Sequence, residues 1–191
     1  MSASIADRAA VAADAAVEAG RYLRTSWGKA SAQAVLPHDV KLEQDRGSED
    51  VILGTLARRF PEDGWLSEER GFRQAESGLM WVIDPLDGSM NYYRGIPHCC
   101  VSIACRDGHG VVLGVVYDFF REELFTACAG QGAFLNGSPI HVSETTVLSD
   151  AVMAFGLMKD PAEIDAGLAL FSRLAGQVKK VRMMGAAALD L

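Results

Sequence analysis

The sequence predicts an α+β fold that passes into an α/β pattern towards its end. Three observations support this prediction. An Ala-rich stretch near the start has helical spacing, several short apolar segments in the middle are typical of strands, and strand and helix patterns alternate after residue 140. The chain has 191 residues, of which 49% are hydrophobic, so one or two domains with a sizeable core are expected.

The first two elements are expected to be helices. Residues 5–26 are amphipathic, and Ser4 and Asp7 stand at the spacing of a capping box. A second helix is predicted over residues 48–60, with Ser48 as its N-cap. Each helix should bury one apolar face.

The middle of the chain is expected to form an antiparallel sheet, because short turns separate its apolar segments. The predicted strands are residues 79–83, 99–105, 111–117 and 123–127. The later α/β pattern comprises a strand at 152–156, a helix at 162–175, a strand at 178–183 and the start of a helix at 186. We therefore expect an N-terminal α+β part over 1–143 and the start of an incomplete α/β part over 144–191.

Composition excludes several classes of partner. The chain has 18 basic and 25 acidic residues, giving a net charge of −7, and it lacks a basic block. Neither a nucleic-acid polymer nor a membrane is therefore an expected partner, and no apolar run approaches the ~20 residues of a membrane span. The N-terminus does not have the pattern of a signal peptide. The four cysteines lack zinc-site spacing, so we expect free, buried thiols and a cytoplasmic location.

The stretch from Asp84 to Asn91, with the sequence Asp-Pro-Leu-Asp-Gly-Ser-Met-Asn, carries the most chemistry. It follows an apolar strand, and Asp-Pro is typical of a type I turn, which would bring the Cα atoms of Asp84 and Asp87 within ~7 Å. Both carboxylates and the Leu86 carbonyl could then converge as hard oxygen ligands for Mg²⁺. Gly88 would allow close backbone approach.

Ser89 is placed to begin a short helix over 89–94, whose free amides would attract a phosphate. Two further acidic positions lie upstream of this motif. Glu68 and Glu69 follow a predicted short strand, and Asp45 lies just before the second predicted helix. Their local patterns alone favour a solvated acidic pair and a helix-capping residue.

Together these residues resemble the inositol monophosphatase family, Mg²⁺-dependent, lithium-sensitive phosphatases related to fructose-1,6-bisphosphatase. The family pattern is an acidic pair followed by D-P-I/L-D-G-S/T-x-N. Segments 41–45, 68–69, 84–91, 114–117, 130–137 and 184–191 are similar to family landmarks and come in the same order. The resemblance implies a layered α-β-α-β-α sandwich. The family's later W-D-x-A-A-G motif, which supplies a further metal-binding Asp, is absent, so we expect that a longer parent chain continues.

The resemblance also implies roles for individual residues. The metal ligands would be Glu68, Asp84, the Leu86 carbonyl and Asp87. The catalytic residues would be Glu68 and Ser89, which align a water, with Asp45 in support; Glu68 is preferred to Glu69 as the ligand. The substrate would contact Asp87, Gly88, Ser89, Gly185 and Ala187.

The implied function is Mg²⁺-dependent hydrolysis of a small phosphorylated alcohol, with inositol monophosphate as the default substrate. Histidinol phosphate, fructose bisphosphate and 3′-phosphoadenosine nucleotides remain alternatives within the family. A haloacid-dehalogenase-type phosphatase is less consistent, because its two acids are one residue closer together. A truncated, non-catalytic metal- or phosphate-binding module is the alternative from another class. By analogy we also expect a homodimer, with residues 98–105 in the contact.

Overall fold

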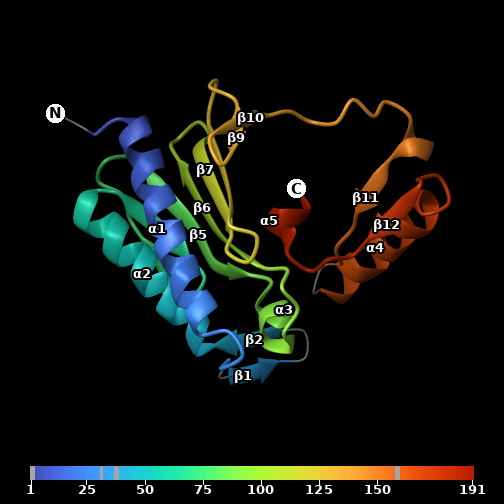
Figure 1. Ribbon diagram of the computed structural model, residues 1–191, viewed down its shortest axis with the longest axis horizontal. Coiled ribbons are helices and arrows are strands. Elements are labelled where there is room, and N and C mark those ends of the chain that lie inside the picture. The colour runs from blue at the N-terminus through green and yellow to red at the C-terminus, as the bar shows by residue number, and fades with distance from the viewer. Residues whose placement is uncertain (1–2, 31, 37–38, 158–159) are drawn as a thin grey trace.

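A mixed eight-stranded sheet, covered on one face by two helices, forms the larger part of the molecule (Figure 1). The structure is a computed structural model that describes residues 3–30, 32–36, 39–157 and 160–191. Its helices are α1 (Ile5–Thr25), α2 (Glu43–Arg59), α3 (Ser89–Arg94), α4 (Pro161–Leu174) and α5 (Ala187–Asp190), with a 3-10 turn η1 (Leu148–Asp150).

The four strands predicted for the centre of the chain are present, and further strands precede and follow them in the sequence. They are β1 (Ala32–Leu36), β2 (Asp39–Leu42), β3 (Gly64–Ser67), β4 (Gly71–Arg73), β5 (Met80–Asp87), β6 (Cys100–Arg106), β7 (Val111–Asp118), β8 (Glu123–Cys128), β9 (Ala133–Leu135), β10 (Ser138–Ile140), β11 (Val152–Ala154) and β12 (Lys180–Arg182).

The large sheet has the order β10-β9-β8-β7-β6-β5-β3-β4. Strands β5 to β8 are antiparallel neighbours, which confirms the predicted antiparallel sheet. The exception is the parallel pairing of β3 with β5, which lays Ser67 beside Ile83. This pairing brings the acidic residues that follow β3 towards the end of β5, where the sequence predicts the site.

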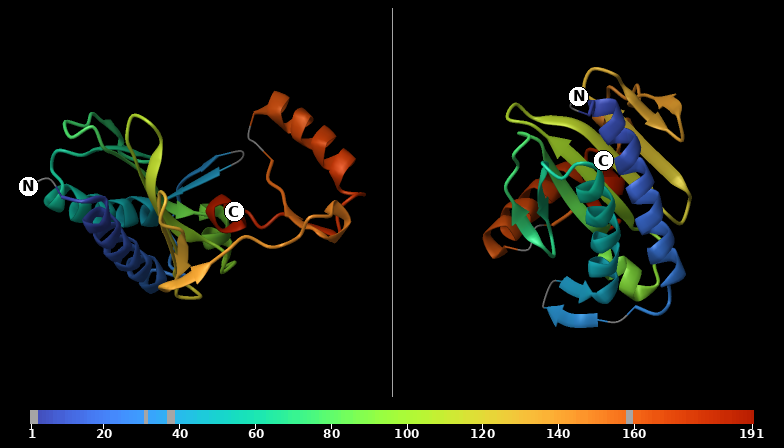
Figure 2. Two further views of the ribbon diagram at one scale, coloured as in Figure 1. Left: turned by 90° about the horizontal axis from the view of Figure 1, so that it is seen from above. Right: turned by 90° about the vertical axis from the view of Figure 1, so that its left-hand side faces the viewer.

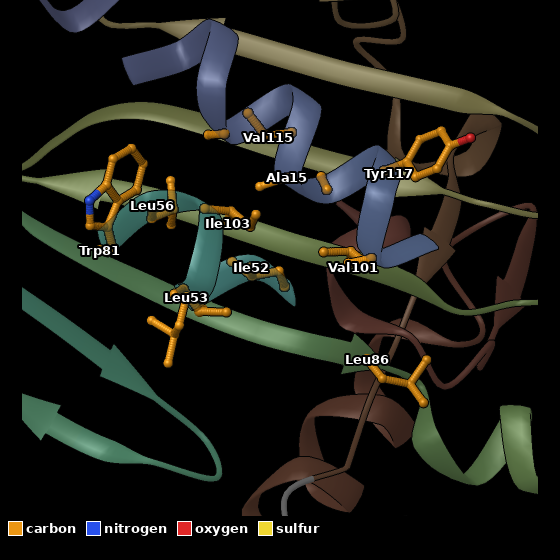
Figure 3. Packing of buried hydrophobic residues seen from close by; sticks show 14 of the residues in the cluster. Ala15, Ile52, Leu53, Leu56, Trp81, Leu86, Val101, Ile103, Val115 and Tyr117 are labelled. Atoms are coloured by element: carbon orange, nitrogen blue, oxygen red, sulfur yellow. The ribbon is translucent and has the colours of Figure 1, made fainter. Parts of the chain in front are cut away.

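The core lies between the sheet and helices α1 and α2. Ser4 and Asp7 form the predicted capping box at the start of α1, and small residues such as Ala12 and Ala16 are fully buried on its inner face. These short side chains let α1 approach the sheet closely. Figure 3 shows the core side chains that meet between the helices and the sheet, among them Ala15, Ile52, Leu56, Trp81, Ile103 and Val115.

The later α/β pattern is confirmed as a strand-helix-strand unit. Strands β11 and β12 pair in parallel, with α4 between them in the sequence. Two views show this unit lying apart from the large sheet, after an extended connection that follows β10 (Figures 1 and 2). The chain then returns, and α5 lies next to the large sheet (Figure 1). The proposed boundary between residues 143 and 144 stays a prediction.

The prediction for the second helix was wrong at its start. Helix α2 begins at Glu43, so Asp45 and Ser48 lie inside it. The N-terminus of α2 is capped by a residue of its own first turn, because the Asp45 carboxylate accepts a hydrogen bond from the Leu42 amide at 2.8 Å. Ser48 is fully buried and donates to the Pro85 carbonyl at 2.7 Å. A serine that contacts the sheet through its hydroxyl was thus mistaken for a cap.

The predicted type I turn at Asp84 was also wrong. Strand β5 continues through Pro85 to Asp87, and three steps from Asp84 to Asp87 oppose two steps from Ser102 to Cys100 on β6. This irregularity is a β-bulge with one extra residue in β5, a position where a sheet tolerates proline.

The β1–β2 hairpin was not predicted, because its residues lack a strong alternating pattern. The region proposed for a dimer contact, residues 98–105, stays a prediction. In strand β6, Val101, Ile103 and Cys105 are buried in the chain's own core, which accounts for their apolar character without a partner. Three of the four free cysteines are buried as expected, whereas Cys128 is half-buried. Within the described residues, no helix has the length and apolar character needed to cross a membrane.

Candidate active site

The bulge in β5 determines how the two aspartates of the motif are oriented. Side chains alternate along a regular strand, so Asp84 and Asp87, three positions apart, would face opposite sides of the sheet. The extra residue shifts the alternation, which turns Leu86 into the core and Asp87 towards the side of Asp84. The charge of Asp87 accordingly raises the pKa of Asp84.

Asp84 has a strongly perturbed acidity. Burial, followed by the charges of Asp87 and Glu68, raises the pKa of Asp84 to about 7. Its Oδ1 accepts a hydrogen bond from the Leu86 amide at 3.1 Å, which opposes the rise. Carboxylates from β5 and from the segment after β3 therefore share one region, and their charges act on Asp84 together.

Asp45 belongs to the same group. Burial raises the pKa of Asp45 to about 7, the charge of Glu68 adds to the rise, and hydrogen bonds from Leu42 and Ser89 oppose it. The Ser89 hydroxyl lies 3.2 Å from Asp45 Oδ1 and 2.8 Å from the Leu86 carbonyl oxygen, so its one proton can go to either acceptor. Ser89 thus links the Asp45 carboxylate of α2 to the Leu86 carbonyl of β5.

The two glutamates after β3 have different environments. The Glu69 carboxylate is only 5% exposed and forms ion pairs with Lys41 at 2.5 Å and Arg46 at 3.3 Å. Glu68 is more exposed, and its charge acts on both Asp45 and Asp84. Glu69 is therefore paired with two cations, whereas the charge of Glu68 acts on the two buried aspartates.

The segment around α5 closes the other side of the site, although it lies about a hundred positions further along the chain. The amides of Ala187 and Ala188 donate to the two Asp87 oxygens at 3.1 and 2.7 Å. Gly88 has a φ of 88°, and a Cβ there would lie only 3.2 Å from the Cβ of Ala186. Glycine is thus required both by the backbone conformation and by the close approach.

Sequence reasoning missed several residues that organise this region. Asn91 donates to the carbonyls of His98 and Met184, both at 2.8 Å, and it lies beside Gly185. It thereby ties the α5 segment to the motif. Glu49, fully buried on α2, holds the backbone after β3. Its position four residues after Asp45, on the same helix face, was the only available signal.

The donor set fits a hard divalent cation in its chemistry. The carboxylates of Glu68, Asp84 and Asp87 and the Leu86 carbonyl offer oxygen ligands only, and burial together with the charges of Asp87 and Glu68 raises the pKa of Asp84. Across the described ranges, no three acidic, histidine or cysteine side chains already stand close enough to hold a metal ion. Some of their oxygens accept backbone hydrogen bonds instead, as Asp87 does from α5.

Comparison with known proteins identifies the family. The model of the inositol monophosphatase family matches residues 5–191. The chain belongs to the inositol monophosphatase family. The family relationship makes it a phosphatase, a hydrolase of phosphate esters, and members of this family are generally metal-dependent.

Individual relatives agree with this assignment. An inositol monophosphatase from Mesembryanthemum crystallinum is 36% identical over 98% of this chain and 72% of its own length. The Nus factor SuhB of Pseudomonas aeruginosa is 37% identical over 95% of this chain and 70% of its own length. The crystal structure of the extragenic suppressor protein suhB from Bartonella henselae superposes with a TM-score of 0.89 at 35% identity, covering 94% of this chain and 71% of that chain. The layered α+β fold is therefore confirmed.

Proposed function

We propose that this phosphatase hydrolyses the monoester of a small phosphorylated alcohol with the help of Mg²⁺, and that inositol monophosphate is its substrate. The observation that carries the proposal is the β5 bulge, which directs Asp84 and Asp87 to one side next to the Leu86 carbonyl and Ser89. Structural ion pairs alone would not require this geometry, because the charges of Asp87 and Glu68 both raise the pKa of Asp84.

The proposed metal ligands are Glu68, Asp84 and the Leu86 carbonyl oxygen, with Asp84 and Asp87 available to a second ion. Bound Mg²⁺ would polarise the phosphoryl group and lower the pKa of a water molecule. Of these ligands, the Leu86 carbonyl is held in place by the Ser89 hydroxyl at 2.8 Å. Asp84 is held by the Leu86 amide.

The remaining site residues would orient the water and take up its proton. Glu68 and the Ser89 hydroxyl are placed to accept hydrogen bonds from the water and align it with phosphorus. Ser89 in turn lies 3.2 Å from Asp45, whose pKa of about 7 suits a group that exchanges protons near neutral pH. This water would attack phosphorus directly and in line and release the alcohol, so no covalent phosphoenzyme would form.

The substrate would lie between the β5 motif and the α5 segment. The backbone of Gly88 and Ser89 is proposed to face the phosphate, and Asp87, Gly185 and Ala187 to face the alcohol. Asp87 already accepts two amide hydrogen bonds from the α5 segment, which limits its rotation. A small polyol with several hydroxyl groups suits this lining.

The experiment that tests the proposal measures phosphate release from inositol monophosphate, histidinol phosphate, fructose bisphosphate and a 3′-phosphoadenosine nucleotide, each with and without Mg²⁺. We expect fastest turnover of inositol monophosphate and no turnover after metal removal. Faster turnover of another ester would replace the substrate and keep the mechanism. No release from any substrate would favour a non-catalytic binding module, and a trapped aspartyl-phosphate would contradict direct attack by water.

We also propose a homodimer in the cytoplasm. Four free cysteines are consistent with a reducing compartment. Residues 98–105 remain the proposed contact region, although several apolar residues of β6 are buried within the chain itself. Light scattering at working concentration measures the mass directly, and a monomeric value would contradict the dimer.

A further inference from the structure

One face of helix α2 carries three buried polar residues, Asp45, Ser48 and Glu49, which are 4%, 0% and 0% exposed. Their spacing of three and four positions places them on a single face of the helix. Each contacts a different part of the site. Asp45 binds Ser89, Ser48 binds the Pro85 carbonyl, and Glu49 binds the segment after β3.

Glu49 holds that segment on both sides of Glu68. Its Oε1 accepts hydrogen bonds from the Glu69 amide at 3.0 Å and the Arg70 amide at 3.2 Å. The Ser67 hydroxyl donates to the same oxygen. The donors thus come from the residue before Glu68 and the two residues after it, and together they fix the backbone from which Glu68 projects.

The stability of the fold alone does not explain why position 49 carries a carboxylate. Glu49 is fully buried, and its Oε2 has no hydrogen-bond partner in the structure. Its ion-pair partner is the largely exposed Arg70, whose Nε lies 3.7 Å from Oε2. A buried carboxylate with one oxygen that lacks a hydrogen-bond partner is costly, even though its other oxygen accepts three hydrogen bonds.

We propose that Glu49 is a positioning residue that sets the metal affinity of the site through Glu68, without contacting metal or substrate itself. This inference rests on the proposed role of Glu68 as a ligand. Helix α2 then serves as a common frame, because the same rigid element orients Ser89 through Asp45 and Glu68 through Glu49. Partners that orient a ligand typically change metal affinity by about 10–100-fold when removed.

The test measures Mg²⁺ binding by calorimetry, with Mg²⁺ alone and no substrate. Glu49→Met keeps the length of the side chain but removes both acceptor oxygens, and we expect the dissociation constant to rise about 10–100-fold. Glu49→Gln keeps an acceptor for the two amides and should restore most of the affinity. Asp118→Leu is the matched control, because the buried Asp118 also accepts two successive amides through its Oδ1, from Phe120 and Arg121.

We expect the control to lower the melting temperature without changing the Mg²⁺ dissociation constant. The decisive comparison repeats Glu49→Met in a Glu68→Gln background. If Glu49 acts through Glu68, then Glu49→Met changes the Mg²⁺ dissociation constant of the Glu68→Gln variant by less than about twofold. An equal loss in both backgrounds, or an unchanged constant for Glu49→Met alone, would overturn the inference.

Ser67→Ala provides a second route if Glu49→Met does not fold. It removes one donor to Glu49 and should weaken Mg²⁺ binding by about threefold or more. An unchanged constant would overturn the inference. Failure of the proposed function would give a different result. The wild-type protein would then bind no Mg²⁺, and the Glu68→Gln variant would bind none either.

Discussion

Two groups of buried carboxylates lie near opposite ends of β5, and their charges are balanced in opposite ways. Asp63 accepts two hydrogen bonds from the Arg8 guanidinium, at 2.8 and 2.9 Å. Ser77 and Trp81 donate to its remaining positions, so each oxygen has two donors. At the other end, burial and the charges of Asp87 and Glu68 raise the pKa of Asp84 to about 7.

The difference separates structural from functional polar groups. The Arg8–Asp63 pair is 6% and 1% exposed, and Phe60 stacks under the guanidinium at 4.7 Å, so the pair joins α1 to the segment before β3. Every polar atom of Asp63 has a partner from the chain. In the group around Asp84, burial and the charges of neighbouring carboxylates raise the pKa of Asp84 to about 7, and this unbalanced arrangement is typical of functional sites.

The largest expected effect comes from removing one charge of the unbalanced group. Asp84→Asn should lower kcat/KM by about 10³-fold, because the proposed ligand to both metal ions is lost. Mg²⁺ should raise the melting temperature of wild type but not of the variant. Without metal, the variant should be at least as stable as wild type, since one repelling charge is gone. Normal turnover with a full Mg²⁺ shift would show that Asp84 is no ligand.

The balanced group should respond in the opposite way. Asp63→Ala leaves the buried Arg8 cation without its partner, which should cost about 3–5 kcal/mol of unfolding free energy. Denaturant unfolding measures this loss, and the folded variant should keep the wild-type kcat. A loss below ~1 kcal/mol would mean that Arg8 finds another partner or becomes exposed.

The pH dependence of stability is a third distinction. The pKa values of Asp45 and Asp84 are raised in the folded chain, so folding favours their protonated forms. Their contribution to the free energy of unfolding is complete below the unfolded pKa near 4, and it is lost as pH rises through about 7. Without metal, the melting temperature should therefore fall between pH 5 and pH 8. A slope that is identical in Asp84→Asn would contradict this assignment.

The smallest effects should come from one hydroxyl in each group. Ser77→Ala removes a 2.7 Å hydrogen bond to Asp63 and should cost about 1 kcal/mol of stability without affecting activity. Ser89→Ala should lower kcat about 10–100-fold and change the melting temperature by only a few degrees. Parallel melting curves and rate measurements compare the two. Reversed effects would show that the two groups have been assigned the wrong roles.

The sequence predicted much of the fold because the decisive signals were local. The capping box of Ser4 and Asp7, the antiparallel strands and the short helix at 89–94 each depend on neighbouring residues. The bulge was mistaken for a turn, because Asp-Pro fits both and only pairing with β6 distinguishes them. Ser48 was mistaken for a cap for a similar reason, since its partner, the Pro85 carbonyl, is remote in sequence.

The candidate site was only partly predictable for the same reason. Asp84, Asp87 and Ser89 lie in one motif, whereas Glu68 and Asp45 rested on family resemblance. The contact between Asp87 and the α5 segment joins residues about a hundred positions apart, which no local pattern reveals. Glu49 was overlooked because a glutamate in a helix ordinarily indicates a solvated surface.

The extra residue in β5 has a consequence for how this chain can change over time. Deleting one residue from the bulge would restore an unbroken ladder with β6, a regular arrangement that a sheet accommodates easily. The same deletion would rotate Asp87 to the opposite side, away from Asp84. At this position, selection for a more regular strand and selection for chemistry oppose each other, so an irregular backbone can persist only while the chemistry is used.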